Sequence, residues 1–587
     1  MLFVGLVILF LVTRCAFLDR DLPPNGISNY VVLDEQFYTI PAFDWYNTDQ
    51  PYNTFDLSDE YSLKYSQPIN VLQNLMTYVS LLTFGNNYYG LRMASVVAAL
   101  VSFILLFIIF SRIMLHSQKD RTEGELQHHY YLLLFFMAYL LSDFAFLMAS
   151  RVAEPTIFRL MALTIVMYVG SMPRNAGSLE SERCYSALLG FLCMAVVLFV
   201  YVYTLFIFAA MIVTVGVLAY RKGIGNTTKQ FAYFLLGSLL CLIFYQWFIG
   251  VTYHSSIVDV FQYMTAFETR LGVGSSLTES IGLFLINLLS IGMTNVFKYN
   301  VVLIFAFLVV LPVFLHKLKT QKTKFDILLF NLLLFLGLQS MVINDYPERK
   351  LVIILPLVVT LIAIGFFSDA KGYWKRMQEE GSIRFVKLYW FAAYMLSFSV
   401  WIVYSFVMYR SPYFLEVKMA LLLNLGVFIT GSVFMVSYFL QGRSISRIWI
   451  TLVLMLMLLP NIYLDDKYVY QDRTFFYRDA MIRMAEEVDG QILIGGCSFG
   501  FRLYNDSIPV LDWYNYYIPR QMERYDLMFD FLLAEGVGNY SLAYTQGENM
   551  DSPIEAGYME KHGLRLVEEY ELGDIFPTNM GLYLLQR

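Results

Sequence analysis

Val31-Val-Leu-Asp-Glu-Gln-Phe-Tyr-Thr-Ile-Pro-Ala42 places two adjacent carboxylates, Asp34 and Glu35, among aromatic side chains. The stretch lies in a polar interval, residues 18–68, which follows an apolar segment at 1–17. A transmembrane helix needs about 17 to 25 mainly apolar residues, so segment 1–17 just reaches that length and the interval after it does not. We therefore expect Asp34 and Glu35 outside the bilayer, at the catalytic edge of a membrane enzyme.

The composition is that of a polytopic membrane protein. Of 587 residues, 58% are hydrophobic and only 15% are charged, which is more apolar surface than a soluble protein of this length can bury. The net charge of -6 provides no basic face for nucleic acid. The five cysteines show no CxxC or metal-ligand spacing, so neither a disulfide framework nor a zinc site is predicted.

Thirteen apolar segments are predicted to cross the membrane. The first is expected to be a retained helix rather than a cleaved signal peptide, because no basic region precedes it and Arg14-Cys-Ala-Phe-Leu-Asp-Arg20 is a poor cleavage site. Residues 69–84 and 281–297 are interrupted by polar side chains and are predicted to lie in the interface. The spans are 1–17, 91–113, 130–149, 156–173, 185–201, 203–220, 230–250, 299–316, 327–344, 351–367, 388–409, 419–440 and 448–464.

Lysine and arginine in the loops predict the orientation. One set of loops holds about nineteen of them, including Lys317-Leu-Lys-Thr-Gln-Lys-Thr-Lys324, whereas the opposite set is longer and holds about eleven. The basic set is expected to be cytoplasmic. The N-terminus is then cytoplasmic, and both the Asp34 loop and the C-terminal tail face outward.

The tail, residues 465–587, is predicted to form an extracytoplasmic α/β domain, and residues 1–464 a transmembrane domain. The tail has a higher proportion of charged residues than the segments before it. Helical and strand patterns alternate in it over about 120 residues, which is enough for a core of its own. Gly495-Gly-Cys-Ser-Phe-Gly500 lacks the Lys-Ser/Thr ending of a phosphate loop and is interpreted as an ordinary turn. The predicted helices are 473–488 and 520–535, and the predicted strands are 491–495, 540–544, 564–570 and 581–585.

Several ionisable residues stand in or beside the apolar segments, where each costs at least a few kcal/mol unless it faces a cavity or a partner. Asp143 is expected to be a structural partner of a polar group on another helix. Arg151 and Glu154 either line a cavity or form an interfacial pair that reaches water. Cations at the outer span ends can snorkel or hold an anionic phosphate. These cations are Arg92, Arg270, Lys298, Arg349 and Lys350.

Four motifs together resemble the C-type membrane glycosyltransferases (GT-C fold), in the branch of the protein O-mannosyltransferases and the lipid A aminoarabinose transferases. Leu33-Asp-Glu-Gln-Phe-Tyr-Thr-Ile-Pro-Ala42 is similar to the Asp-Glu-x-x-Tyr-x-x-x-Ala motif of the first outer loop. Gln67-Pro-Ile-Asn with Leu82–Ser95, Ala149–Pro155 and Pro347–Pro356 resemble later motifs. Pro68-Ile-Asn replaces the usual Pro-Pro-Leu, and Arg349-Lys350 replaces an Arg-Tyr, which puts the substrate in doubt more than the reaction.

The resemblance implies a GT-C-like architecture whose residues 18–90 form the outer catalytic loop and interfacial helices. It implies sugar transfer from a polyprenyl-phosphate donor to a lipid, glycan or protein acceptor on the outer face of the plasma membrane. Asp34 is the expected general base of an inverting reaction, supported by Glu35; on spacing alone either carboxylate can hold either role. Arg92, Arg270, Arg349 and Lys350 are expected at the donor phosphate. Tyr38, Arg151 and Glu154 are expected to line the cavity.

Other interpretations stay open at this point. Many spans and interrupted helices also suit a transporter or lipid flippase, although the sequence shows no internal repeat and its ionisable residues gather on the outer side. A third interpretation is a non-catalytic scaffold whose outer domain binds a partner. Some C-type relatives use a divalent metal, Mg or Mn, but two carboxylates do not establish one, and no metal ligand is assigned.

Overall fold

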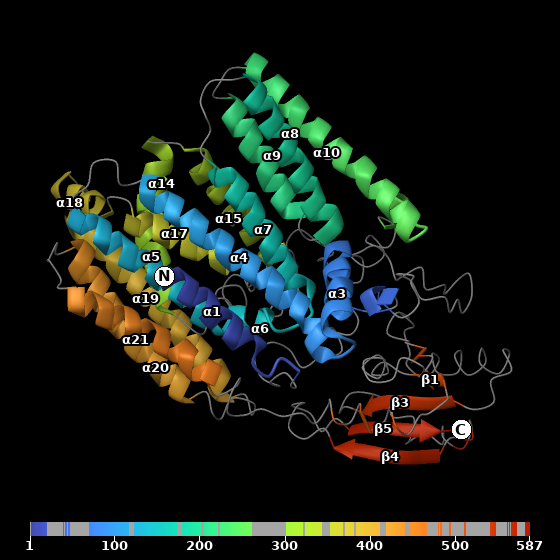
Figure 1. The fold of residues 1–587 in the computed structure, drawn as a ribbon. Helices are drawn as coiled ribbons and strands as arrows, with labels where there is room; N and C mark the ends of the chain where they lie inside the picture. The colour runs from blue at the N-terminus through green and yellow to red at the C-terminus, as the bar shows by residue number, and fades with distance from the viewer. Residues whose placement is uncertain are drawn as a thin grey trace.

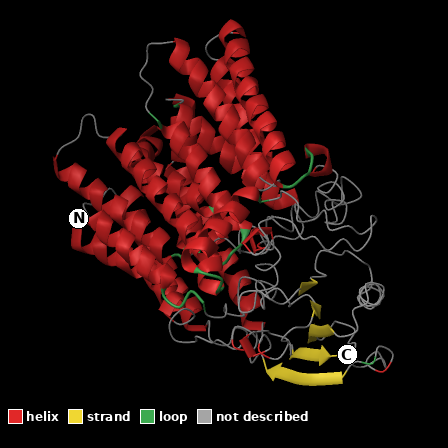
Figure 2. Cartoon of the chain, turned by 45° about the vertical axis from the view of Figure 1, so that its right-hand side comes forward, coloured by secondary structure: helices red, strands yellow, loops and turns green. Residues whose placement is uncertain are grey.

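The computed structural model shows a bundle of helices with a small β-sheet beside one end of it (Figure 1). A second view, turned by 45°, shows the same separation of helices and strands (Figure 2). The structure describes residues 2–19, 39, 41–43, 45–46, 70–116, 123–172, 179–200, 205–220, 224–260, 301–320, 323–342, 353–367, 370–380, 383–410, 418–440, 447–466, 479, 482–483, 486, 492–494, 510–511, 540–546, 560, 563, 565–571 and 581–586.

Each of the thirteen predicted spans overlaps at least one helix, and span 130–149 overlaps two, α5 and α6. Among the described residues, six helices are long and apolar enough to cross a membrane, or seven if the bent pair α17 and α18 forms one span. The polytopic membrane fold is thereby supported, while the count of thirteen and the orientation of the ends stay predictions. The helices are α1 (Leu2–Cys15), α3 (Val71–Phe84), α4 (Tyr88–His116), α5 (Glu123–Ser142), α6 (Phe144–Ala149), α7 (Pro155–Ser171), α8 (Leu179–Ala195), α9 (Leu205–Tyr220), α10 (Ile224–Thr252), α14 (Val302–Thr320), α15 (Lys324–Val342), α17 (Leu355–Phe367), α18 (Ala370–Glu380), α19 (Ile383–Arg410), α20 (Lys418–Met435) and α21 (Arg447–Asp465), with π-helical turns η1 (Val196–Val200) and η5 (Val436–Leu440).

Helix α4 occupies the middle of the bundle. It packs against α1, α3, α5, α7 and α17, and its Ala98, Ala99 and Phe103 are fully buried. In lipid the apolar tails compete with apolar side chains, so close packing rather than water exclusion holds helices together. The small alanines let neighbouring backbones approach α4, and Phe103 fills the space beside Phe10 of α1, with ring centroids 4.9 Å apart.

Glycines bring α8 and α10 into direct backbone contact. A Cβ on Gly190 would overlap the carbonyl oxygen of Phe234, and a Cβ on Gly237 would overlap that of Ala187. Ser238 Oγ donates to the Gly190 carbonyl across the contact, at 3.1 Å. Small residues at such a crossing are typical of helix pairs in membranes, where close approach gives the packing energy.

Helix α3 is polar on its buried face and apolar on its exposed face. Gln73, Thr77 and Ser80 are buried, whereas Val79 and Leu82 are more than half exposed. At 1.5 Å per residue its 14 residues span about 21 Å, too short to cross the hydrocarbon core. The prediction of a non-spanning helix at 69–84 agrees with this length. The second such prediction, 281–297, lies outside the described residues.

The strands form one five-stranded sheet in the order β2-β1-β3-β5-β4. Strand β1 pairs parallel with β2 and β3, and β5 pairs antiparallel with β3 and β4. All four predicted strands are confirmed, and β2 was not predicted. Helix 520–535 lies outside the described residues, as does most of helix 473–488. The strands are β1 (Ile492–Ile494), β2 (Val510–Leu511), β3 (Tyr540–Gln546), β4 (Arg565–Glu571) and β5 (Gly581–Gln586).

The α8–α10 contact predicts that glycine-to-alanine substitution has different effects at two positions. Gly190→Ala should lower the thermal midpoint of the detergent-solubilised protein, because a crowded contact typically costs about 1–3 kcal/mol. Gly216→Ala in α9 should leave it unchanged or raise it, because nothing lies within 4 Å of the new Cβ and alanine is about 1 kcal/mol better than glycine in a helix. Equal midpoints for the two variants would contradict the backbone contact.

Candidate functional site

The structure describes three of the predicted site residues. Arg92, Arg151 and Glu154 are all buried, with exposed fractions of 3%, 1% and 4%. The alternative that Arg151 and Glu154 form an interfacial pair reaching water is therefore wrong, and so is snorkelling for Arg92. The other predicted site residues lie outside the described residues, and their roles stay predictions. They are Asp34, Glu35, Tyr38, Arg270, Lys298, Arg349 and Lys350.

Arg151 closes the C-terminal end of α1. Its Nη1 donates to the carbonyl oxygens of Thr13 and Arg14, at 3.0 and 2.9 Å. Its Nη2 donates to the carbonyl of Phe17 at 2.7 Å. The last carbonyls of a helix have no intrahelical partner and carry the negative end of the helix dipole, so a buried guanidinium there is doubly favourable. Arg151 therefore sets the point at which the chain leaves α1.

A second arginine holds the following turn. Arg92 Nη1 donates to the carbonyl of Leu18 at 2.9 Å, and its guanidinium lies 4.9 Å from the centre of the Tyr88 ring. Between the two arginine contacts, Phe17 has a φ of +51°, in the left-handed region that favours glycine. Arg92 and Arg151 together stabilise this strained exit, and the segment they hold leads directly into the loop that carries Asp34 and Glu35.

Arg14, in the last turn of α1, is fully buried and was missed in the sequence. Its guanidinium lies over the rings of Phe10 and Phe146, 4.3 and 5.6 Å from their centres, and its Nη1 donates to Thr13 Oγ1 at 2.8 Å. It also interacts electrostatically with Asp143 and Asp465. The available signal was an arginine at the end of an apolar segment, which ordinarily predicts a side chain that reaches water.

Asp143 divides the predicted span 130–149 into two helices, α5 and α6. Its Oδ1 accepts from the backbone N–H of Phe146 at 2.9 Å, as an N-cap residue does, and its Oδ2 accepts from Tyr139 Oη at 3.2 Å. Both hydrogen bonds are local, and the predicted partner on another helix is Arg14 of α1, which interacts with Asp143 electrostatically. Asp143 ends the first helix and begins the second because its carboxylate competes for the backbone donors there.

Asp465 brings the last helix to the same place. It ends α21, which packs against α5 and α6, and it interacts electrostatically with Arg14, Arg151 and Asp143. Two arginines and two aspartates thus gather where α1, α5, α6 and α21 meet. Groups of opposite charge reduce the cost of burying each other, so the junction is balanced rather than simply cationic.

The turn between α6 and α7 joins this junction to α3. Glu154 occupies the N-cap position of α7, with Pro155 at the first helical position, where the missing N–H of proline costs nothing. Gln73 Nε2 of α3 donates to the carbonyl of Ala153 at 2.9 Å. The polar face of α3 is therefore fixed beside Arg151 and Glu154, two of the three residues predicted to line the cavity.

Metal binding is not resolved by the described part of the chain. No three His, Cys, Asp or Glu side chains within it are close enough together to hold an ion. The Asp34–Glu35 pair lies outside the described residues, so the alternative of a divalent metal there stays open.

Comparison with known proteins shows the fold. No protein-family model matches the sequence, and no curated protein matches it. The structure is similar to two crystal structures of ArnT from Cupriavidus metallidurans, one bound to undecaprenyl phosphate and one in the apo state. Both are 11% identical, cover 99% of this chain and 97% of theirs, and have TM-scores of 0.57 and 0.56. The predicted GT-C fold is confirmed.

A more distant likeness is to the Archaeoglobus fulgidus oligosaccharyltransferase. That structure is 8% identical, covers 93% of this chain and 69% of its own, and has a TM-score of 0.47. A likeness at this level supports no inference about the present chain.

Removing the Arg151 contacts should open the end of α1 locally, and the reactivity of the Cys15 thiol measures that opening. In a variant whose only cysteine is Cys15, Arg151→Met should raise the rate of maleimide labelling by at least about tenfold. Loss of charged hydrogen bonds to the end of α1 typically costs 1.5–3 kcal/mol and increases the open population accordingly.

Arg112→Met is the matched control for that measurement. Arg112 donates to Tyr168 and Ser171 at the opposite end of α7, so its loss should leave Cys15 labelling unchanged. Equal increases in both variants would show general destabilisation instead of a local clamp.

Proposed function

We propose that this chain, which shares its fold with ArnT, transfers a sugar from a polyprenyl-phosphate-linked donor to an acceptor at the outer face of the membrane. The supporting observation is the likeness over 99% of the chain to a structure that holds undecaprenyl phosphate. A carrier of this kind has a long apolar tail and an anionic head, and a polytopic bundle can present both a lipid-facing surface and a polar site to it.

Asp34 is proposed as the general base. An acceptor hydroxyl is a weak nucleophile near neutral pH, and a carboxylate that removes its proton typically contributes 10²–10⁴-fold to the rate. The oxygen of the acceptor forms a bond to C1 of the sugar while the bond from C1 to the phosphate oxygen breaks. The electron pair of that bond leaves with the polyprenyl phosphate, and attack from the opposite face inverts the anomeric centre.

Glu35 is proposed to bind the acceptor or to fix the loop. Adjacent residues project their side chains in different directions, so one carboxylate can face the reacting atoms while the other supports the backbone. The Arg92 and Arg151 contacts anchor residues 13–18, which precede both carboxylates in the chain.

The leaving phosphate gains negative charge as its bond to the sugar breaks, and preorganised cations stabilise that charge. Arg270, Arg349 and Lys350 are proposed for this role. Arg92 was predicted among them, but its hydrogen bond to Leu18 favours a positioning role, in which it acts on the phosphate only through the loop. Tyr38 and Glu154 are proposed to line the cavity.

The base assignment predicts a large loss of turnover. Asp34→Asn should reduce release of polyprenyl phosphate from a polyprenyl-phosphate sugar by about 10²–10⁴-fold, with an extract of the host envelope as acceptor. Glu35→Gln should raise the apparent KM for the acceptor more than it lowers kcat. The anomeric configuration of the product, measured by NMR, should be opposite to that of the donor.

Glu379→Gln is the control for these two variants. Glu379 is exposed in α18 and pairs only weakly with Lys375, at 3.7 Å, so the substitution should leave turnover unchanged. Full turnover in a folded Asp34→Asn variant would refute the assignment of the base. Absence of turnover with every donor would favour a lipid transporter or flippase.

A further inference from the structure

Helix α3 buries a row of polar atoms that have no hydrogen-bond partner within the described part of the chain. Asn70, at the N-cap position, and then Gln73 and Thr77 lie three and four residues apart, so they share one face of the helix. Their exposed fractions are 4%, 0% and 0%, and Asn70 Oδ1, Gln73 Oε1 and Thr77 Oγ1 are all unpaired. Buried polar groups in folded proteins are nearly always paired, so three unpaired oxygens on one face indicate partners that come from outside the chain.

A fourth unpaired group lies near the first turn of α3. Tyr253, directly after α10, belongs to the same packed cluster as Val71 of α3. Tyr253 is 6% exposed, and its Oη has no hydrogen-bond partner among the residues that the structure describes. The unpaired groups therefore come from two elements that meet in one cluster, as the walls of a binding site do.

Helix α3 also contacts both predicted parts of the candidate site. Trp45, in the loop predicted to carry the base, stacks on Tyr78 of α3 with ring centroids 4.8 Å apart. Gln73 Nε2 donates to the carbonyl of Ala153, in the turn before α7. The row of unpaired oxygens is therefore carried by the element that joins this loop to that turn.

The chemistry of the row favours a ligand with several hydroxyl groups. Amide and hydroxyl oxygens accept hydrogen bonds, and α3 contains no lysine or arginine. An ionised phosphate is itself an acceptor, so these amide oxygens do not pair with it. A sugar offers an O–H donor on each free hydroxyl, and the hydroxyls of Thr77 and Tyr253 can both accept from it and donate to it.

The position of α3 can change about its C-terminal end. The helix ends at Gly85, whose φ of +90° is a conformation that glycine adopts without strain. Near this end Ser80 Oγ donates to the carbonyl of Gly90 at 2.6 Å. At the other end, the hydrogen bond from Gln73 to Ala153 holds the helix to the turn before α7. A rotation about Gly85 that breaks this bond would admit a ligand to the unpaired row, which lies at the end away from the hinge.

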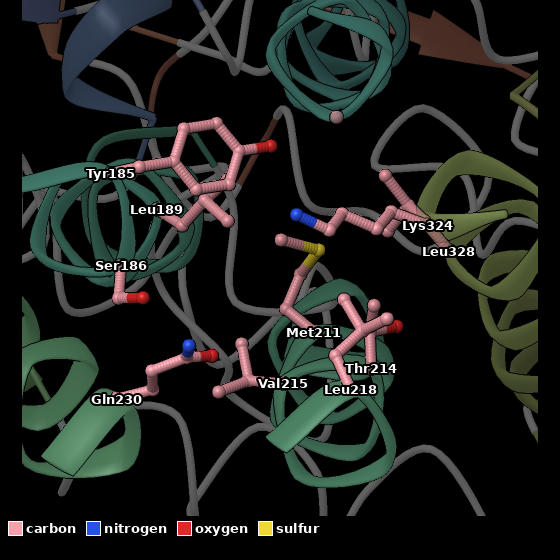
Figure 3. A pocket seen from close by; sticks show the side chains of 11 residues that line it. Tyr185, Ser186, Leu189, Met211, Thr214, Val215, Leu218, Gln230, Lys324 and Leu328 are labelled. Carbon is pink, nitrogen blue, oxygen red and sulfur yellow. The ribbon is translucent and has the colours of Figure 1, made fainter. Parts of the chain in front are cut away.

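The cavity between α7, α8, α9, α10 and α15 provides a contrast (Figure 3). Its volume of about 30 Å³ suits about two water molecules. Tyr185 Oη donates to the carbonyl of Val169 at 2.9 Å, and Thr214 Oγ1 accepts from Asn331 at 2.8 Å. Interactions also engage Lys324, Ser186 and Gln230. This cavity is therefore suited to water, whereas the polar face of α3 still needs partners.

We propose that α3 is a lid that closes over the transferred sugar, whose hydroxyl groups pair with Asn70, Gln73, Thr77 and Tyr253. The inference rests on the proposed function, since it assigns the sugar of the polyprenyl-phosphate substrate to α3 and leaves the phosphate to the cations. The sugar supplies hydrogen bonds that the closed helix otherwise lacks, so its binding favours the closed position over the open one.

Two substitutions that remove one hydroxyl and largely keep the shape of the side chain test the contacts. Thr77→Val and Tyr253→Phe should each raise the KM for the polyprenyl-phosphate sugar about three- to tenfold, as loss of one neutral hydrogen bond does, with little change in kcat. Neither should lower the thermal midpoint of the ligand-free protein, because each removes a buried hydroxyl that has no partner. Thr77→Ser, which keeps the hydroxyl, should retain the KM of the unmodified protein.

Thr83→Val is the matched control. Thr83 is exposed on the same helix, and its hydroxyl donates to the carbonyl of Val79 within that helix, so its loss should leave the KM unchanged. A lower thermal midpoint with an unchanged KM in Thr77→Val and Tyr253→Phe would show a purely structural role and overturn the inference. Absence of turnover by the unmodified protein would count against the proposed function, and the lid is then tested by labelling alone.

Thiol labelling tests the lid without turnover. In a variant whose only cysteine is introduced by Thr77→Cys, the rate of maleimide labelling measures the opening of α3. The probes are the undecaprenyl-phosphate derivatives of mannose, glucose, galactose and 4-amino-4-deoxyarabinose. The matching one should slow labelling at least about tenfold, and undecaprenyl phosphate should slow it far less. Thr83→Cys in the same background should label rapidly with every probe. Equal protection of Thr77→Cys by undecaprenyl phosphate, or protection by none of the four sugars, would overturn the inference.

Discussion

The capping of α1 by Arg151 is the interaction on which this end of the helix bundle depends. A helix that ends near a bilayer leaves carbonyl groups that water reaches poorly, and each needs a donor. Arg151 supplies donors to two of them, on Thr13 and Arg14, and to the carbonyl of Phe17 in the turn that follows, where Arg92 also donates to Leu18. Both arginines are buried, so their own charges require compensation from the surrounding helices.

That compensation explains why four helices meet at one place. Asp143 separates α5 from α6 and interacts electrostatically with Arg14. Asp465 ends α21 and interacts electrostatically with Arg14 and Arg151. Asp465 is also among the last described residues before the C-terminal segment that holds the sheet. The same group of charges therefore fixes both the exit of the first loop and the exit of the last helix.

The sequence predicted the helices and four strands because their signals are local. A run of apolar residues of sufficient length, or a short β-branched stretch between turns, needs no knowledge of its neighbours. The sequence did not predict the helix break at Asp143, where one carboxylate forms an N-cap inside a continuous apolar run. It also did not predict the burial of Arg14, because one of its aromatic neighbours, Phe146, lies on a helix distant in the sequence. Arg92 was placed correctly at a span end, but its acceptor on Leu18 depends on tertiary contact and has no local signal.

Helix α3 also constrains the order in which the protein assembles. Its exposed face is apolar, but its buried face carries amide and hydroxyl groups that donate to α4 and to the turn before α7, as Ser80 does to Gly90 and Gln73 to Ala153. A segment this short and this polar gains little from entering lipid alone. We expect it to remain at the membrane surface during synthesis and to dock after α7 is in place, so this part of the candidate site is completed late in biogenesis.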